Sequence, residues 1–105
     1  MPAMKPFEGA SEGHELLREW MRDEYGASAR TSRPSWSAIK AFHAALNEHL
    51  SAGLALRSPN AVYDWFPEAQ NLAWPSDPFR LAIAEMSGGK VPLMAWMRPL
   101  PSEAA

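Results

Sequence analysis

Proline and glycine divide this chain into short segments, and this division limits the folds that it can adopt. Ten prolines and six glycines are spread through 105 residues and fall at the ends of apolar segments. Proline removes a backbone donor and interrupts a helix, whereas glycine readily ends one. No stretch alternates apolar and polar residues as a half-buried strand does. We therefore expect an all-α domain of four to five short helices.

Apolar residues at spacings of three and four predict where these helices lie. We expect helices over 13–25, 36–51, 59–66 and from Asp77 to the Gly88-Gly89 pair, with a last turn over 92–97. In the third segment, Val62 and Trp65 form the inward pair. The clearest periodicity is in 36–51, where the predicted buried positions are Trp36, Ile39, Phe42 or His43, Leu46 and Leu50.

Small polar residues stand where the helices are expected to begin. Ser35, Ser58 and Asp77 are predicted N-caps, because such side chains accept hydrogen bonds from free N–H groups of the first turn. Gly26 is expected to end the first helix in the left-handed region, and Gly53 is expected to end the second.

The five tryptophans divide into two groups. Trp74 lies in the irregular stretch 67–76, where it could cover the edge of the core or stand out as a contact residue. The other four lie on apolar helical faces and are expected in the core: Trp20, Trp36, Trp65 and Trp96.

Length and composition predict one small domain. Hydrophobic residues make up 47% of the chain, and the lack of cysteine excludes disulfides and cysteine-bound metals. We expect a flexible N-terminal segment over 1–12, a folded domain over 13–99 and a flexible tail over 100–105. No apolar run approaches the ~18 residues of a membrane helix, and the N-terminus lacks the apolar core of a signal peptide. The expected location is the cytoplasm, away from membranes.

The chain shows no pattern typical of catalysis or metal binding. His43 and His49 are six residues apart, on different faces of one predicted helix, and His14 has no cluster around it. Zinc sites need three or four ligands at close spacing. We interpret the histidines as structural or surface residues, and we expect no enzyme activity, no cofactor and no metal.

Positive charge is concentrated in the middle of the chain. Residues 30–57 carry a net charge of +3, from four cations against Glu48 alone, whereas the whole chain carries −2. Such asymmetry indicates the side that meets a partner, or else an unevenly charged solvated surface. The four cations are Arg30, Arg33, Lys40 and Arg57.

Residues 58–65, Ser-Pro-Asn-Ala-Val-Tyr-Asp-Trp, resemble the recognition helix of lambda-repressor-like helix-turn-helix proteins of the Cro, XRE and YdaS type. That helix reads S-x-x-x-V-x-x-W. Similar stretches are Leu16–Met21, which resembles the first helix of these proteins, and Trp74-Pro75, Arg80–Ile83, Ser87–Val91, Trp96 and Arg98-Pro99, which resemble their tail. The resemblance covers roughly residues 13–99.

The sequence departs from this family pattern in two ways. Seven residues separate Leu50 from Ser58, so the turn is unusually long. The segment that resembles a recognition helix has no lysine or arginine, and it carries Asp64, which phosphates would repel.

The resemblance implies a sequence-specific DNA-binding transcription regulator of phage type. Asn60 and Tyr63 would face the major groove, with Arg57 and Ser58 toward the backbone. The phosphates would be contacted by Arg30, Arg33 and Lys40. Regulators of this fold commonly pair, which implies a homodimer. The alternative is a degenerate helix-turn-helix scaffold that binds a protein partner, as a phage-encoded inhibitor or adaptor would.

Overall fold

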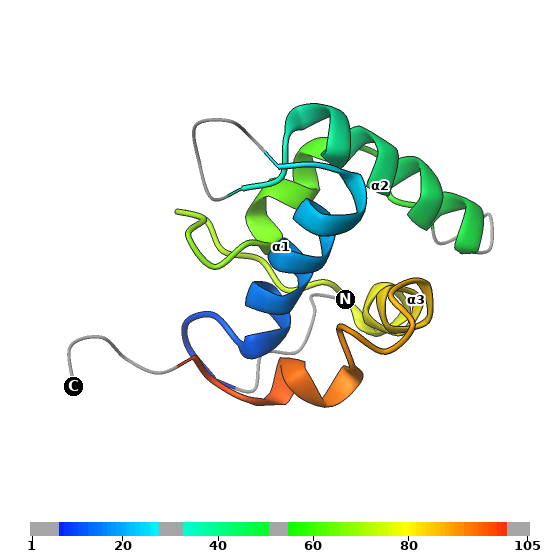
Figure 1. Ribbon diagram of the computed structural model, residues 1–105. Helices are drawn as coiled ribbons and strands as arrows, with labels where there is room; N and C mark the ends of the chain where they lie inside the picture. Colours follow the sequence, from blue (N-terminus) through cyan, green and yellow to red (C-terminus); the bar gives the residue numbers. More distant parts are fainter. Residues whose placement is uncertain (1–6, 28–32, 51–54, 101–105) are drawn as a thin grey trace.

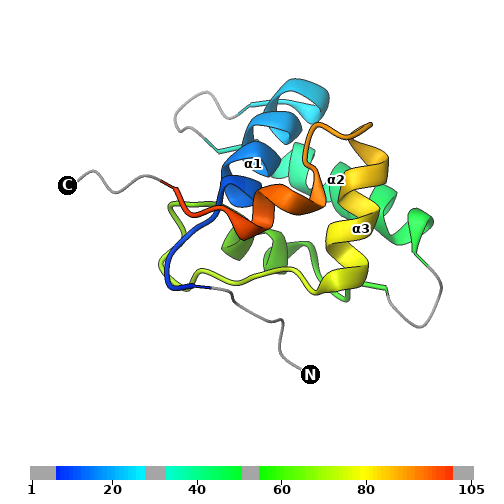
Figure 2. The ribbon, with the colours of Figure 1, turned by 90° about the horizontal axis from the view of Figure 1, so that it is seen from below.

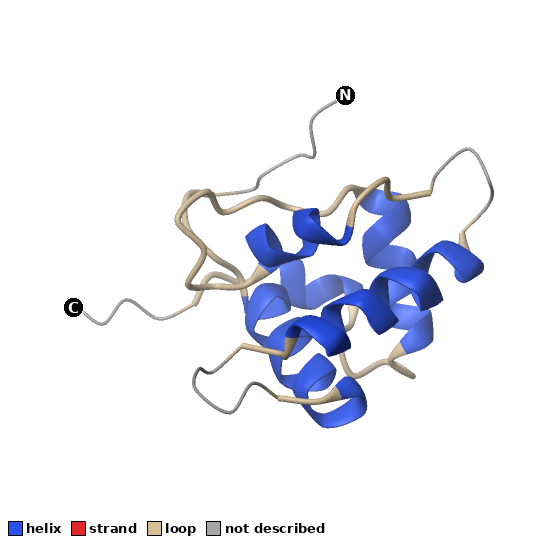
Figure 3. Cartoon of the chain, turned by 90° about the horizontal axis from the view of Figure 1, so that it is seen from above, coloured by secondary structure: helices blue, strands red, loops and turns tan. Residues whose placement is uncertain are grey.

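Three α-helices and two 3-10 helices form the computed structural model, which describes residues 7–27, 33–50 and 55–100 (Figure 1). In chain order they are α1 (Glu12–Tyr25), α2 (Trp36–His49), η2 (Pro59–Trp65), α3 (Asp77–Met86) and η3 (Leu93–Met97). The described ranges contain no strand, only two isolated bridges (Figure 3). The all-α fold predicted from the sequence is confirmed.

A capping box begins α1. The Oγ of Ser11 accepts a hydrogen bond from the His14 N–H at 3.4 Å, and the Ser11 N–H donates to Nδ1 of His14 at 3.0 Å. This reciprocal pair satisfies two backbone donors at the helix start. Gly26 ends the helix with φ 126° and ψ 143°. That conformation suits glycine, but its ψ is extended rather than that of the expected left-handed turn.

The second helix begins as expected but ends earlier. The Ala38 N–H donates to Oγ of Ser35 at 3.1 Å, which confirms the predicted N-cap. The helix ends at His49 rather than at residue 51. Phe42, not His43, takes the core position that the periodicity left open, and the buried apolar residues of α2 are Ala38, Ile39, Phe42 and Leu46.

The prediction that Trp36 lies in the core is wrong. Its side chain is 40% exposed. It is the first residue of α2, where the core-facing stripe has not yet begun, and its ring lies against Tyr63 instead.

The third α-helix begins one residue earlier than predicted. Ser76 occupies the N-cap position, and Asp77 is the first helical residue, so the prediction that Asp77 is the cap is wrong. Asp77 forms an ion pair with Arg80 one turn later. Gly88 and Gly89 end the helix with φ values of 62° and 88°, a region that favours glycine, and this confirms the predicted stop.

Four of the five tryptophans lie in the core. Trp20, Trp65 and Trp96 are buried as predicted. Trp74, for which the sequence left two positions open, is also buried, and its ring contacts those of Phe7 and Trp96. The remaining core consists mainly of aliphatic side chains from all five elements and the segments between them.

The two ends of the described chain meet beside α1. The Glu12 N–H donates to the Arg98 carbonyl at 2.8 Å, and the Leu100 N–H donates to the Ala10 carbonyl at 3.2 Å. Figure 2 shows η3 and the segment that follows it running past the start of α1. Residues 7–12 and Leu100, which the sequence assigned to the terminal segments, therefore contact the folded part. Among the described residues, no helix has the length and apolarity needed to cross a membrane.

Candidate nucleic-acid interface

The segment that resembles a recognition helix is a 3-10 helix. Its Ser58 cap is confirmed, because Oγ accepts from the Asn60 N–H at 3.2 Å. A 3-10 helix has 3.0 residues per turn, so residues three apart lie above one another. Val62 and Trp65 are accordingly both buried, as predicted. Asn60 is exposed and Tyr63 is half-buried.

Asn47 anchors the long connection between α2 and η2. Its Oδ1 accepts from the Leu56 N–H at 2.7 Å, and its Nδ2 donates to the Leu56 carbonyl at 3.0 Å. Nε2 of His43 donates to the same carbonyl at 2.8 Å. The chain is thus held against α2 just before η2 begins. Residues 51–54, which include the predicted helix end at Gly53, lie outside the described residues.

Four side chains form a layered surface group: Arg33 precedes α2, Trp36 and Lys40 lie in its first turns, and Tyr63 belongs to η2. The rings of Trp36 and Tyr63 are parallel, with centroids 5.6 Å apart. The Arg33 guanidinium lies 6.0 Å from the centre of the Tyr63 ring, and the Lys40 ammonium lies 5.9 Å from that of Trp36. Such cation–π contacts are favourable at these distances. We call this group, Arg33, Tyr63, Trp36 and Lys40, the cation–aromatic stack.

The structure brings three predicted contact residues together in this stack: Arg33, Tyr63 and Lys40. Trp36 was missed as a surface residue, although its position at the very first turn of α2 was visible in the sequence. Arg57 is exposed ahead of η2, and Ser58 serves as the cap. Arg30 lies outside the described residues.

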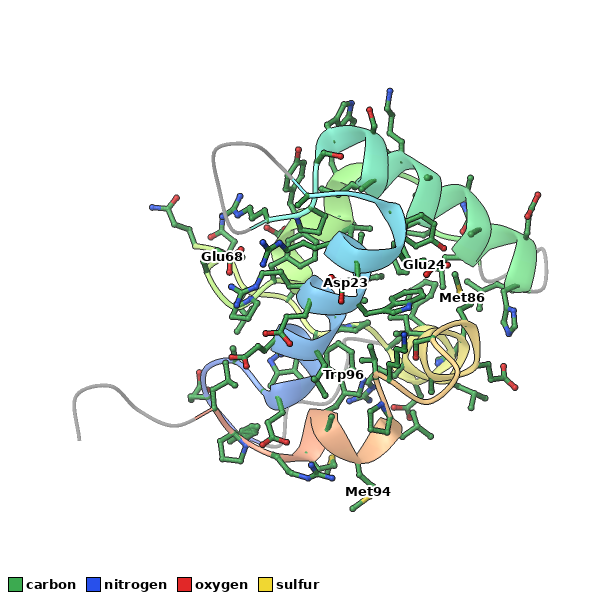
Figure 4. The ribbon with its side chains drawn as sticks, viewed as in Figure 1. Asp23, Glu24, Glu68, Met86, Met94 and Trp96 are labelled. Atoms are coloured by element: carbon green, nitrogen blue, oxygen red, sulfur yellow. The ribbon has the colours of Figure 1, made fainter. Side chains whose placement is uncertain are left out.

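Two carboxylates lie next to the stack. Glu68 accepts from Arg18 at 2.5 Å and from Nε of Arg33 at 3.3 Å (Figure 4). Asp64 lines a polar pocket of about 320 Å³ together with Arg33 and Tyr63. The charge of Arg33 is therefore partly balanced by Glu68, while Lys40 remains exposed at the other end of the stack.

His14 is buried and has a structural role. Burial, with a smaller contribution from the charge of Arg80, lowers the pKa of His14 to about 4, although its bond to Ala73 opposes this. Nε2 donates to the Ala73 carbonyl at 3.1 Å, so the neutral ring accepts at Nδ1 from Ser11. Across residues 7–27, 33–50 and 55–100, no three His, Asp or Glu side chains are grouped to hold a metal.

Comparison with known proteins assigns the chain to no family. The chain matches no family model, no curated protein and no solved structure. The helix-turn-helix resemblance therefore remains a hypothesis based on the motifs themselves, and the function has to be inferred from the residues of this chain.

Proposed function

We propose that the chain binds double-stranded DNA as a sequence-specific transcription regulator of the helix-turn-helix type. The observation that carries this proposal is the cation–aromatic stack, in which Arg33 lies over the Tyr63 ring and Lys40 over the Trp36 ring of a parallel pair. A long cationic side chain loses less conformational freedom on binding when it already lies against a ring. The stack thus provides two preorganised cations for phosphates.

The neighbouring η2 residues supply the other contacts of the proposed interface. Asn60 is exposed, and an asparagine amide can pair with both N6 and N7 of adenine in the major groove. Arg57 precedes the Ser58 cap and is placed to contact the backbone. Asp64 and Glu68 repel phosphates, so the affinity for arbitrary DNA sequences should be modest. The base contact of Asn60 should therefore contribute a larger share of the affinity for the preferred site.

Salt dependence tests the phosphate contacts. The preferred duplex is first selected from a random library, and binding is then measured by fluorescence anisotropy over a range of salt concentrations. Each lost phosphate contact should lower the slope of log affinity against log salt by about 0.9. We expect this change for Lys40→Ala and not for Lys90→Ala, which removes an exposed lysine outside the stack. Equal slopes for the two variants would show that the stack does not contact the phosphates.

Base recognition is tested at Asn60. Loss of one bidentate contact should cost about 1–3 kcal/mol on the selected site. Asn60→Ala should leave binding to unrelated duplexes nearly unchanged, because phosphate contacts carry no sequence information. Arg57→Ala should weaken binding to all sequences alike. If Asn60→Ala weakens both kinds of duplex equally, the amide does not read a base.

A protein-binding scaffold is the second candidate function. The observation that favours it is the pair of carboxylates beside the stack, since Glu68 compensates Arg33 and Asp64 lines the adjoining pocket. Such a mixed surface suits a protein partner better than a phosphate backbone. Failure to select any duplex, together with capture of a protein that Asp64→Ala abolishes, would replace the DNA proposal with this one.

A further inference from the structure

Two arginines from different segments of the chain share one carboxylate. Nη1 of Arg18, in the middle of α1, donates to one oxygen of Glu68 at 2.5 Å. Nε of Arg33, which precedes α2, donates to the other oxygen at 3.3 Å. Both guanidinium groups therefore lie within reach of a single small anionic group. We call Arg18 and Arg33 the arginine pair.

Each member of the arginine pair has a support that does not involve Glu68. The Arg18 side chain is only 19% exposed, so the body of the molecule restricts it. The Arg33 guanidinium lies over the Tyr63 ring. Two like charges held this close repel each other, and an anion between them removes the repulsion. The arginine pair is thus a preorganised anion site, because little side-chain freedom is lost when an anion binds.

Glu68 makes only single contacts in this site. It offers one oxygen to each guanidinium, so neither arginine forms with it the paired, parallel N–H bonds that a guanidinium fork can make with one anion. Phosphate oxygens accept such paired bonds, and arginine is preferred wherever phosphate is recognised in this way. Glu68 therefore occupies the place of a phosphate group with weaker geometry than a phosphate would have.

The Glu68 side chain can leave this place without a change in the fold. It is 30% exposed and belongs to the turn that follows η2, and Figure 4 shows it on the side of the molecule away from α3. The turn is held by backbone bonds, from the Ala69 N–H to the Phe66 carbonyl at 3.1 Å and from the Ala73 N–H to the Asp64 carbonyl at 2.7 Å. Neither bond uses the carboxylate of Glu68, so a rotation about its side-chain bonds is enough to uncover the arginine pair.

We propose that the arginine pair binds a phosphate group, and that Glu68 is an intramolecular competitor that occupies this site in the free protein and rotates away when the phosphate binds. With Glu68 in place, its charge and that of the neighbouring Asp64 cancel the two charges of the arginine pair. When Glu68 leaves, one positive charge remains. Only an anion that binds the arginines better than a carboxylate does can therefore open the site.

The source of the phosphate connects this site to the proposed function, on which the DNA part of the inference rests. On a duplex, a backbone phosphate would displace Glu68, and Arg18 of α1 would join Arg33 and Lys40 as a phosphate contact. The interface would then extend from the cation–aromatic stack to α1. A free phosphate ion would use the same two guanidinium groups, because the arginine pair recognises the phosphate oxygens and not the molecule that carries them.

Titration of the full chain with inorganic phosphate tests the site without DNA. At constant ionic strength, the NMR signals of the Arg18 and Arg33 Nε–H groups should shift together with one Kd. Glu68→Gln should lower this Kd by about fivefold, the effect of removing one unit charge at close range even in water. Glu12→Gln is the matched control, since it releases Arg98 from its carboxylate in the same way but leaves a single arginine there. Equal Kd values for these two variants, or no shift of either signal in Glu68→Gln, would overturn the proposal.

The salt dependence of duplex binding then identifies the source of the phosphate. On the selected duplex, Arg18→Gln should lower the slope of log affinity against log salt by about 0.9, and Arg98→Gln should not. If Arg18→Gln abolishes the binding of inorganic phosphate but leaves this slope unchanged, the arginine pair serves free phosphates and the site stands without DNA. If Arg18→Gln alters neither measurement, the site is wrong, while the slope of Lys40→Ala still decides the proposed function separately.

Discussion

His14 links three parts of the chain that are distant in sequence. Its ring completes the cap of α1 through Ser11, donates to the Ala73 carbonyl, and packs edge-on against Trp74 and Trp96. Protonation would place a charge in this apolar site and would remove the acceptor at Nδ1. The folded state therefore holds the neutral ring, in keeping with the pKa of about 4.

This histidine should make folding stability depend on pH. The folded pKa lies near 4 and the unfolded pKa near 6.5, so the unfolded chain binds the proton first as the pH falls. The contribution is complete above about pH 6.5 and is lost toward pH 4. Between pH 7.5 and 5 the unfolding free energy should fall by about 2 kcal/mol from this group. Urea unfolding of the wild type and of His14→Gln measures the difference.

The control is His49→Gln, which alters an exposed histidine paired with Glu85. This variant should keep the pH dependence of the wild type, whereas His14→Gln should lose most of it. If His14→Gln retains the full dependence, another group is responsible.

At the scale of the elements, helix α1 contains a glycine, Gly13, whose lack of a side chain lets η3 pack closely against it. Gly13 is buried in the first turn, and a β-carbon at this position would lie 2.3 Å from Cδ2 of Trp96. The indole of η3 therefore packs directly on the backbone of α1. A residue that weakens the isolated helix allows the close approach of two elements.

We predict that Gly13→Ala destabilises the protein. In an unobstructed helix this change stabilises by about 1 kcal/mol. Here the added methyl group has to displace a buried indole, and overpacking of this kind costs about 1–3 kcal/mol. Thermal or urea unfolding gives the sign. In a Trp96→Phe background the ring is smaller, so Gly13→Ala should cost less; an equal cost in both backgrounds would exclude the clash as the cause.

The two aromatic residues that begin α2 and end η2 should differ in their effect on stability. Trp65 is 4% exposed and belongs to the core, so Trp65→Ala should cost about 3–5 kcal/mol. Trp36 contributes mainly its contact with Tyr63, so Trp36→Ala should cost about 0.5–1.5 kcal/mol. Denaturant unfolding compares them, and similar midpoints would contradict the core position of Trp65.

At the scale of the whole molecule, the last element, η3, joins the end of the chain to its beginning. η3 packs against α1 and α3, and the bonds from Glu12 to Arg98 and from Leu100 to Ala10 join the two ends of the described chain. The fold is therefore closed by residues more than 85 positions apart in sequence, and not by local helix pairing alone.

Truncation tests this closure. A chain that ends after residue 92 lacks the buried Trp96 and leaves the apolar face of α1 uncovered, so it should lose cooperative unfolding. A chain that ends after Leu100 keeps every bond described above and should retain a cooperative transition. Calorimetry distinguishes the two, and a cooperative transition in the shorter chain would contradict this account.

Local rules in the sequence were enough to place most of the elements. Ser35 and Ser58 are caps because a serine before an apolar period satisfies the first free N–H groups. The spacing of Val62 and Trp65 placed both in the core, since a spacing of three brings side chains to one face in either kind of helix. These outcomes depend on residues within a few positions of one another.

Contacts between distant residues decided what the sequence left open or misassigned. Trp74 is buried because three rings from other segments cover it, those of Phe7, His14 and Trp96. Trp36, at the first turn of α2, packs on Tyr63 and stays 40% exposed. The sequence by itself determined where the helices lie, the caps Ser35 and Ser58, and the candidate cations of the middle segment. Only the tertiary structure assembled Arg33, Lys40 and Tyr63 around Trp36 and left apolar side chains of α3 and η3 exposed, because side-chain periodicity specifies a face but not the partner that covers it.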